Sequence, residues 1–200
     1  MGDEYHIRMK GIIDEGRIFG TKLRLEREIS SIQGQNIIRI KDTVTNVGYA
    51  TSPYTILYHM NFRYPMLSEF AELILDPEKT VPATAFAAEG INEFKRFIKP
   101  TANIQEQVYF HSVKKDSQGQ SKVTLQNRKL GIAVTIKSNA DQLPYLTEWK
   151  MMGKGDYVLG IEPCNVPAKN RVALKDENIL PWLKAGESVT NNIEVILSDL

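Results

Sequence analysis

Apolar and polar residues alternate along most of this chain, which is the two-residue period of half-buried β-strands. Turns that contain Gly, Asn or Asp follow many of these runs, as expected for hairpins. The alternating runs cover residues 5–13, 21–30, 38–44, 51–65, 106–111, 122–127, 132–136, 145–151, 156–165 and 189–197. We therefore predict an all-β, mostly antiparallel sandwich of about ten strands with almost no helix.

Two long segments lack this period. Between Met66 and Thr101 the alternation fails, because Pro and Gly residues interrupt it. We predict a long loop that covers another part of the protein, with no more than a short helical turn at residues 92–97. Residues 166–185 contain two prolines and are also predicted to be a loop.

The stretch Asp-Tyr-Val-Leu-Gly-Ile-Glu-Pro-Cys-Asn (156–165) ends its strand with a carboxylate. Alternation places Gly160 and Glu162 on one face, and Pro163 is predicted to end the ladder. Gly160 leaves room for another group to approach. Glu162 is therefore either a residue at the rim of the sheet or a working acid or base.

Composition narrows the class of protein. The 200 residues suit one domain, residues 1–200, and 42% hydrophobic residues suffice for a core. A net charge of +1 without a basic run disfavours nucleic acid and membrane partners. A single cysteine excludes an internal disulfide, and the charged first ten residues do not resemble a signal peptide. We predict a soluble, cytoplasmic protein.

No phosphate-binding loop, metalloprotease helix or nucleophile elbow occurs, so the candidate chemistry rests on polar residues of strands. His59 lies in mid-strand, either as an acid or base or as a half-buried histidine bonded to a neighbour. His111 has the same two interpretations. Trp149 with Lys150 is either a packed aromatic beside a solvated partner or a platform and donor for a sugar.

Glu162 is the strongest candidate for a base, because a partly desolvated carboxylate has a raised pKa. Its alternative is a rim carboxylate paired with Arg171 or Lys169. Cys164 is interpreted as a small buried hydrophobe, and it receives no functional role.

Four segments, in this order, resemble the aldose 1-epimerase (galactose mutarotase-like) superfamily, in particular a little-characterised bacterial branch. Arg171 and the turn at residues 184–187 add to the resemblance. The segments are Leu-Tyr-His-Met-Asn-Phe-Arg-Tyr-Pro (57–65), Glu-Gln-Val-Tyr-Phe-His (106–111), Leu-Pro-Tyr-Leu-Thr-Glu-Trp-Lys (143–150) and Tyr-Val-Leu-Gly-Ile-Glu-Pro-Cys-Asn (157–165). The resemblance implies an antiparallel β-supersandwich with a sugar cleft.

The resemblance also implies a mechanism. His59 would protonate the ring oxygen, and Glu162 would take the proton from the anomeric hydroxyl, without a metal or nucleotide cofactor. The sugar opens, rotates about the bond next to C1 and recloses on the other face. The remaining motif residues would contact the sugar: Asn61, Arg63, His111, Trp149, Lys150 and Asn165. Arg63 and Lys150 would reach an anionic substituent, or are solvated or packed side chains.

Members of this superfamily usually carry an earlier segment with a second histidine or an arginine that binds the sugar, and the resemblance implies that this chain begins after that segment. We therefore expect a fold that lacks its N-terminal part. Three hypotheses follow from the sequence: a mutarotase that interconverts the anomers of a small-molecule sugar, a carbohydrate-binding domain without turnover, and a structural remnant that needs a partner chain to complete its sheet.

Overall fold

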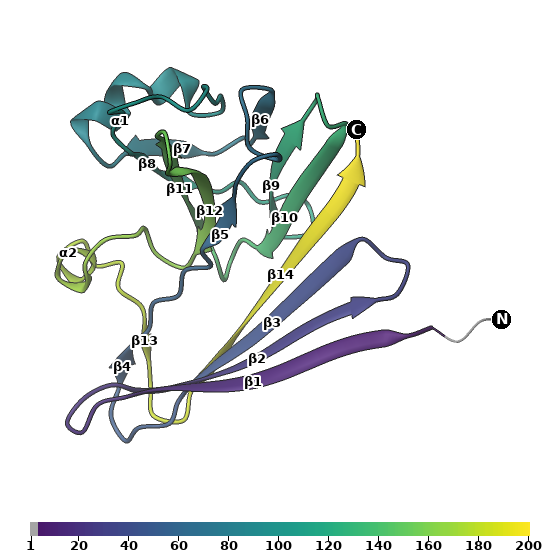
Figure 1. Cartoon of the computed structure of the whole chain (residues 1–200). Coiled ribbons are helices and arrows are strands. Elements are labelled where there is room, and N and C mark those ends of the chain that lie inside the picture. The colour runs from purple at the N-terminus through teal and green to yellow at the C-terminus, as the bar shows by residue number, and fades with distance from the viewer. Residues whose placement is uncertain (1–3) are drawn as a thin grey trace. The chain divides into compact units, whose positions relative to one another are not determined.

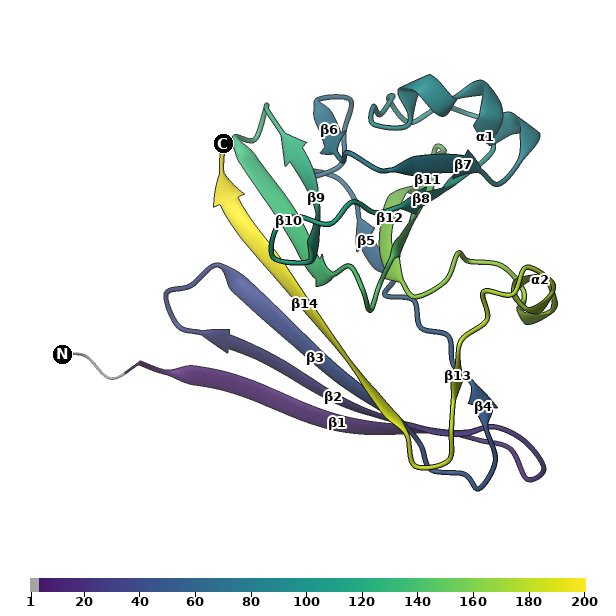
Figure 2. The same ribbon diagram turned by 180° about the vertical axis from the view of Figure 1, so that it is seen from behind.

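The computed structural model describes residues 4–200 and confirms the all-β, antiparallel prediction (Figure 1, Figure 2). The chain forms two compact units: unit 1 holds residues 4–55 and Lys169–Ile196, and unit 2 holds Ile56–Ala168 and Leu197–Leu200. Residues 1–3, where the predicted domain 1–200 begins, lie outside the described residues, and a single domain stays a prediction. Within the described part of the chain, no helix has the length and apolar character to cross a membrane.

Unit 1 is built on an antiparallel sheet in the order β1, β2, β3, β14, with β1 at its edge. Buried Leu23, Val44 and Ile193 lie on one face of this sheet. A short second sheet pairs β4 with β13, and α2 begins at the capping residue Asn170. The bounds are β1 His6–Gly16, β2 Lys22–Ile32, β3 Ile37–Asn46, β4 Ser52–Pro53, α2 Arg171–Asp176, β13 Trp182–Leu183 and β14 Ser188–Asp199.

Unit 2 contains an antiparallel five-stranded sheet in the order β5, β12, β11, β8, β7 and the antiparallel strands β10, β9 and β6. One short α-helix and one 3₁₀ turn join β7 to β8. The bounds are β5 Met60–Phe62, β6 Ala71–Ile74, β7 Lys79–Pro82, α1 Ala85–Glu89, η1 Ile91–Glu93, β8 Gln107–Ser112, β9 Gln120–Asn127, β10 Ile132–Asn139, β11 Tyr145–Met152 and β12 Tyr157–Cys164.

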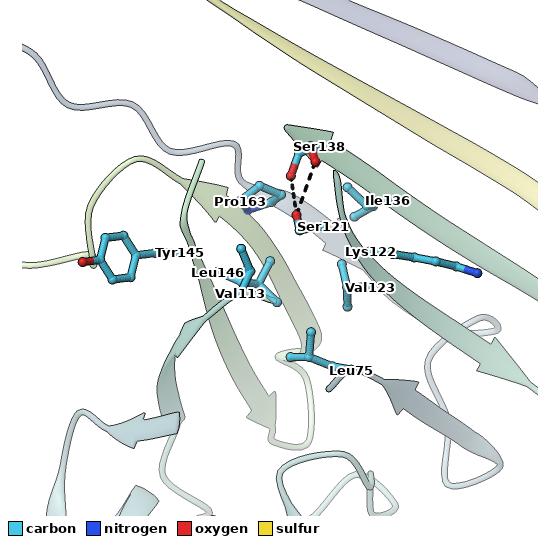
Figure 3. Close-up of a pocket in the computed structure, with 10 residues that line it drawn as sticks. All are labelled: Leu75, Val113, Ser121, Lys122, Val123, Ile136, Ser138, Tyr145, Leu146 and Pro163. Carbon is cyan, nitrogen blue, oxygen red and sulfur yellow. Dashed lines mark hydrogen bonds between the residues drawn. The ribbon is translucent and has the colours of Figure 1, made fainter. Parts of the chain in front are cut away.

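The core of unit 2 lies between its two groups of strands (Figure 3). Leu146 and Pro163, which are cross-strand partners on β11 and β12, face Val123 and Ile136 of β9 and β10 across a small pocket. This pocket lies on the buried face of the five-stranded sheet and contains none of the predicted site residues. The opposite face of that sheet is the one that carries Glu162.

Three sequence predictions about loops and strands need correction. Residues 51–65 form two short strands, β4 in unit 1 and β5 in unit 2, rather than one strand. Residues 66–101 contain β6, β7, α1 and η1 instead of a structureless loop. Residues 166–185 likewise contain α2 and β13. Alternation was present at β6, since Ala71 and Leu73 of the strand and Leu75 directly after it are buried, but the strand spans only four residues and the prolines obscured the period.

Pro163 does not end the strand, because β12 runs to Cys164. The carbonyl oxygen of Pro163 accepts a hydrogen bond from the Tyr58 N–H (3.0 Å). In an antiparallel ladder the N and C=O of one residue point to the same side, so the missing N–H of Pro163 faces the segment at Tyr58 and not β11. The ladder with β11 is therefore intact, while regular pairing with the other neighbour begins only at Met60.

Candidate functional site

The site begins with a cross-strand pair between β12 and the segment that leads into β5. Gly160 pairs with Asn61, and Leu57 forms an isolated bridge with Cys164. Between these two points the same register places His59 opposite Glu162. Two residues that are far apart in sequence thus meet on one face of the sheet because of strand pairing.

His59 and Glu162 are in direct contact. The distance from His59 Nε2 to Glu162 Oε1 is 3.0 Å, and the side chains are 46% and 5% exposed. The contact is not aligned as a hydrogen bond, and Oε1 has no other hydrogen-bond partner among residues 4–200. Glu162 is therefore a buried carboxylate beneath a partly exposed imidazole, and its Oε1 atom is shielded from solvent.

Gly160 makes room for this carboxylate. A Cβ atom at position 160 would overlap Glu162 Oε1, and it would stand 3.3 Å from both the carboxyl carbon of Glu162 and Cε1 of His59. The side chain of Glu162 folds back over Gly160, two residues earlier on the same face. The space predicted beside Gly160 is thus filled by the pair itself.

Burial raises the pKa of the Glu162 carboxyl above its ordinary value of 4.5, and the nearby His59 charge acts in the opposite direction. Desolvation is the larger cause, because it penalises the charged form. The result is a carboxylate that is a stronger base than an exposed glutamate.

Trp149 extends the site along β11. It is the cross-strand partner of Gly160, and its ring meets the His59 ring edge-on, with centroids 5.6 Å apart and an interplanar angle of 69°. Its Nε1–H donates a 2.7 Å hydrogen bond to Oε2 of the exposed Glu106. The indole is thereby held by its ring contact with His59 and by its hydrogen bond to Glu106.

Asn61 and Arg63 continue the alternation that starts at His59. Both side chains are exposed, and Asn61 lies next to Gly160 on the face of the pair. The guanidinium of Arg63, directly after β5, makes no ion pair with residues 4–200. Both remain accessible to a polar ligand near His59.

The opposite face of the same sheet carries a second histidine–glutamate pair, which the structure does not bring together with the first. His111 Nε2 lies 3.2 Å from Glu148 Oε2, and both side chains are 0% exposed. The hydroxyl of Thr80 contacts His111 Nδ1 at 2.9 Å. Burial raises the pKa of Glu148, whereas the hydrogen bond from His111 and the charge of Lys150 lower it.

Lys150 is buried on this opposite face. Its ammonium group donates hydrogen bonds of 2.9 to 3.2 Å to the carbonyl oxygens of Glu93, Phe94 and Arg96. The ring of Phe94 stacks 5.0 Å from that of His111. Residues 93–96 therefore cover the second pair. The predicted contact of His111 and Lys150 with a sugar is untested, and this arrangement does not support it.

The remaining predicted residues have local structural partners. Asn165 Oδ1 accepts a 2.9 Å hydrogen bond from the Ile56 N–H, which anchors the chain just before His59. Cys164 is buried, as predicted, and burial raises its thiol pKa to about 12. Lys169 pairs with Glu177 and Arg171 with Glu15, so neither cation serves Glu162, which is not a rim residue.

Residues 1–197 match a family model described as a domain of unknown function, DUF4432. The chain belongs to the DUF4432 family. No curated protein matches it. Its fold is galactose mutarotase-like, which confirms the resemblance drawn from the sequence.

Three solved structures support this statement about the fold. A Klebsiella pneumoniae protein described as a "putative aldose 1-epimerase" superposes with a TM-score of 0.92 at 26% identity, over 96% of this chain and 51% of that protein. A galactose mutarotase-like protein from Clostridium acetobutylicum gives 0.64 at 14% identity, over 100% and 64% of the two chains. A galactose mutarotase-like protein from Lactobacillus casei superposes with a TM-score of 0.66 at 15% identity, over 96% of this chain and 70% of that protein. This DUF4432 chain thus spans about half of the Klebsiella protein.

The sequence did not predict the residues that contact His111 and Trp149. Glu148 and Thr80 complete the buried pair, and Glu106 holds Trp149, yet none was singled out. The signal for Glu148 was available, because alternation on β11 places Glu148 and Lys150 together on the face opposite Trp149. Glu106 and Trp149 lie 43 residues apart in sequence, and no local pattern connects them.

Proposed function

We propose that this DUF4432 chain carries an aldose 1-epimerase-like site, in which His59 is the acid and Glu162 the base for interconversion of sugar anomers. The observation that carries the proposal is the 3.0 Å contact of the two groups on an accessible face beside Trp149. The Klebsiella relative, described as a putative aldose 1-epimerase and 26% identical, supports it.

The spacing of the pair suits this chemistry. The ring oxygen and the anomeric hydroxyl oxygen of a sugar are bonded to the same carbon, C1. An acid that serves one oxygen and a base that serves the other must therefore lie close together, on one side of that carbon. A sugar at the pair would place its two oxygens above the imidazole and the carboxylate, because the 3.0 Å contact leaves no room between them.

The proton transfers balance. Ionised Glu162 takes the proton from the anomeric hydroxyl while protonated His59 gives a proton to the ring oxygen, and the bond from C1 to that oxygen breaks. The open-chain aldehyde rotates about the bond next to C1. In the reverse step His59 regains its proton from the hydroxyl, the ring closes on the other face, and Glu162 returns its proton to the new anomeric oxygen.

Three neighbouring residues would hold the sugar. The indole of Trp149 offers an apolar surface for a pyranose ring, with its N–H fixed by Glu106. The exposed Asn61 and Arg63 offer donors to hydroxyl groups or to an anionic substituent. A small-molecule sugar is thus the substrate class that this face supports best.

Exchange NMR on equilibrated D-glucose and D-galactose tests the proposal with the 200-residue chain. We expect the wild type to accelerate anomer exchange, and His59→Gln to lose about 10²–10⁴-fold of that acceleration, the usual contribution of general acid–base groups. His6→Gln is the matched control, since His6 lies on β1 of unit 1.

Unchanged exchange in His59→Gln would show that the assignment is wrong. Line broadening or chemical-shift changes that report sugar binding, without faster exchange in the wild type, would instead favour the carbohydrate-binding alternative.

A further inference from the structure

The edge strand β1 has features of an unpaired interface. All eleven of its residues are exposed, including Ile7 at 63%, Met9 at 66% and Ile13 at 58%. These three side chains share one face of the strand, because they are separated by even numbers of residues. Among the described residues, β1 pairs with β2 alone.

The edge lacks two devices that often protect such a strand, a β-bulge and a proline, although it carries charged residues. The register from His6↔Ile32 to Gly16↔Lys22 is continuous, so β1 contains no bulge, and it contains no proline. Eleven residues also exceed the usual strand length of about five or six. A long, regular, partly apolar edge is a template for pairing with another strand.

The hydrogen-bond pattern shows which backbone groups are available. Tyr5 accepts from the Gln33 N–H and the Arg17 N–H donates to Thr21, so odd-numbered residues of this ladder point toward β2. The even-numbered residues from His6 to Asp14 therefore direct their N–H and C=O groups to the open edge. A partner strand must bond to these even positions.

Charge favours a second copy as the partner. The first half of β1 carries Arg8 and Lys10, which both contact Glu28 of β2, and the second half ends with Asp14, which pairs with Arg24 of β2, and with Glu15. Parallel pairing of two β1 strands would place like charges together, whereas antiparallel pairing places the basic half opposite the acidic half. The strand is thus complementary to itself in the antiparallel direction.

We propose that two copies of this chain pair through β1 in an antiparallel, two-fold symmetric dimer with Gly11 opposite Gly11. This register bonds even residues to even residues and sets Arg8 opposite Asp14 of the partner copy. It also sets Met9 opposite Ile13 of the partner copy, so the apolar stripes join on one face. A shift by one pair in one direction would put Lys10 opposite its own copy, and a shift in the other direction would put the apolar Met9 opposite Glu15. Because the interface is isologous, it closes after two copies.

Light scattering on the purified 200-residue chain is the first test. We expect a species of twice the 22.7 kDa chain mass. Met9→Lys should weaken self-association by about tenfold or more, because it places a charge in the apolar contact. Ile18→Lys is the control, since Ile18 is 84% exposed in the turn that follows β1.

A monomer at every concentration would overturn the proposal and show that β1 is left open or covered by another partner. An assembly larger than a dimer, or a dimer that Met9→Lys leaves intact, would overturn it as well.

Cysteine cross-linking tests the register. A Cβ at Gly11 or Gly16 meets no atom within 4 Å, so both positions accept cysteine. Facing Gly11 residues form a non-hydrogen-bonded pair with Cα atoms about 4.5 Å apart, within the range of a disulfide. Gly11→Cys should therefore give a covalent dimer on mild oxidation and Gly16→Cys should not, while the buried Cys164 stays silent. Equal cross-linking at both positions, or none at Gly11, would contradict this register.

Discussion

Two histidine–glutamate pairs occupy opposite faces of the five-stranded sheet in unit 2. In the first, His59 is 46% exposed and Glu162 has an acceptor atom without a hydrogen bond. In the second, His111 and Glu148 are 0% exposed, and the ring of His111 is bonded on both nitrogens. The same two residue types thus stand in an accessible and in an enclosed setting.

The difference shows that access, and not residue type, separates a candidate acid–base pair from a structural one. The enclosed pair is surrounded by Lys150, Thr80 and the segment at residues 93–96, which exclude solvent from it, although Glu148 Oε1, like Glu162 Oε1, has no hydrogen-bond partner among the described residues. The accessible pair has Trp149 beside it and solvent above it. We expect changes at the enclosed pair to act on stability and changes at the accessible pair to act on catalysis.

Lys150→Met is expected to have the largest effect on the enclosed side. It leaves Glu148 buried without its cation and three backbone carbonyls without their donor. We expect a loss of about 3–5 kcal/mol in the free energy of unfolding, measured by urea denaturation. Lys154→Met, at an exposed position after β11, is the control; equal losses in both variants would remove the structural role of Lys150.

Gly160→Ala tests the accessible side. The added methyl group collides with the Glu162 carboxylate and crowds His59, so the pair must shift. We expect anomer exchange to fall by about 10²-fold, since displacements of about 1 Å carry this cost. Gly16→Ala, where the Cβ meets open space, should leave the rate unchanged. A Gly160→Ala protein with wild-type exchange would show that the position of the carboxylate is unimportant.

The pH dependence of stability separates the two carboxyl groups. Burial raises the folded-state pKa of Glu162 above 4.5, so the unfolded chain ionises first as the pH rises. Its stabilising contribution is therefore complete below the unfolded pKa and is lost as the pH rises through the folded pKa. Within that window we expect the contribution of Glu162 to the free energy of unfolding to fall by about 1.4 kcal/mol per pH unit.

The pKa of Glu148 is also raised, so the pH dependence of the wild type alone cannot be assigned to Glu162. The wild type is therefore compared with Glu162→Gln, in which only Glu148 of the two carboxyl groups remains. The difference between their unfolding free energies should decrease with pH over that window and then level off. A difference that does not vary with pH would contradict the raised pKa of Glu162.

Trp149→Phe is expected to have the smallest effect. Phenylalanine keeps an aromatic surface beside His59 but loses the N–H donated to Glu106. We expect KM for the sugar to rise by a few-fold, consistent with about 1 kcal/mol for one hydrogen bond, and kcat to change little. Trp182→Phe in β13 of unit 1 serves as the control, and an equal change in KM there would argue against a sugar contact at Trp149.

The sequence predicted the long strands well, because a two-residue alternation that continues over about eight residues is typical of a strand and does not fit the period of a helix. β1, β2, β3, β9, β10, β11, β12 and β14 were all expected near their observed positions. Short elements such as β6, β7 and α2 were missed because four to six residues give too little periodic signal.

The candidate site was predicted in part. Strand alternation gave Glu162 its face and Gly160 its place beside it, and the family resemblance supplied His59 as the partner. Alternation could also have excluded Lys150 from the predicted sugar-binding residues, because Lys150 lies on the face of the sheet opposite Trp149. The burial of His111 depends on Phe94 and on the fold of residues 83–101, which no local pattern reveals.

The most direct measurement compares Glu162→Gln with Glu148→Gln in both anomer exchange and unfolding free energy. We predict that Glu162→Gln lowers the acceleration of exchange by about 10²–10⁴-fold without loss of stability. Glu148→Gln should lower stability by about 1–3 kcal/mol and leave the rate per folded molecule unchanged. A wild-type chain without acceleration, a Glu162→Gln variant that exchanges normally, or equal loss of rate in both variants would contradict the account.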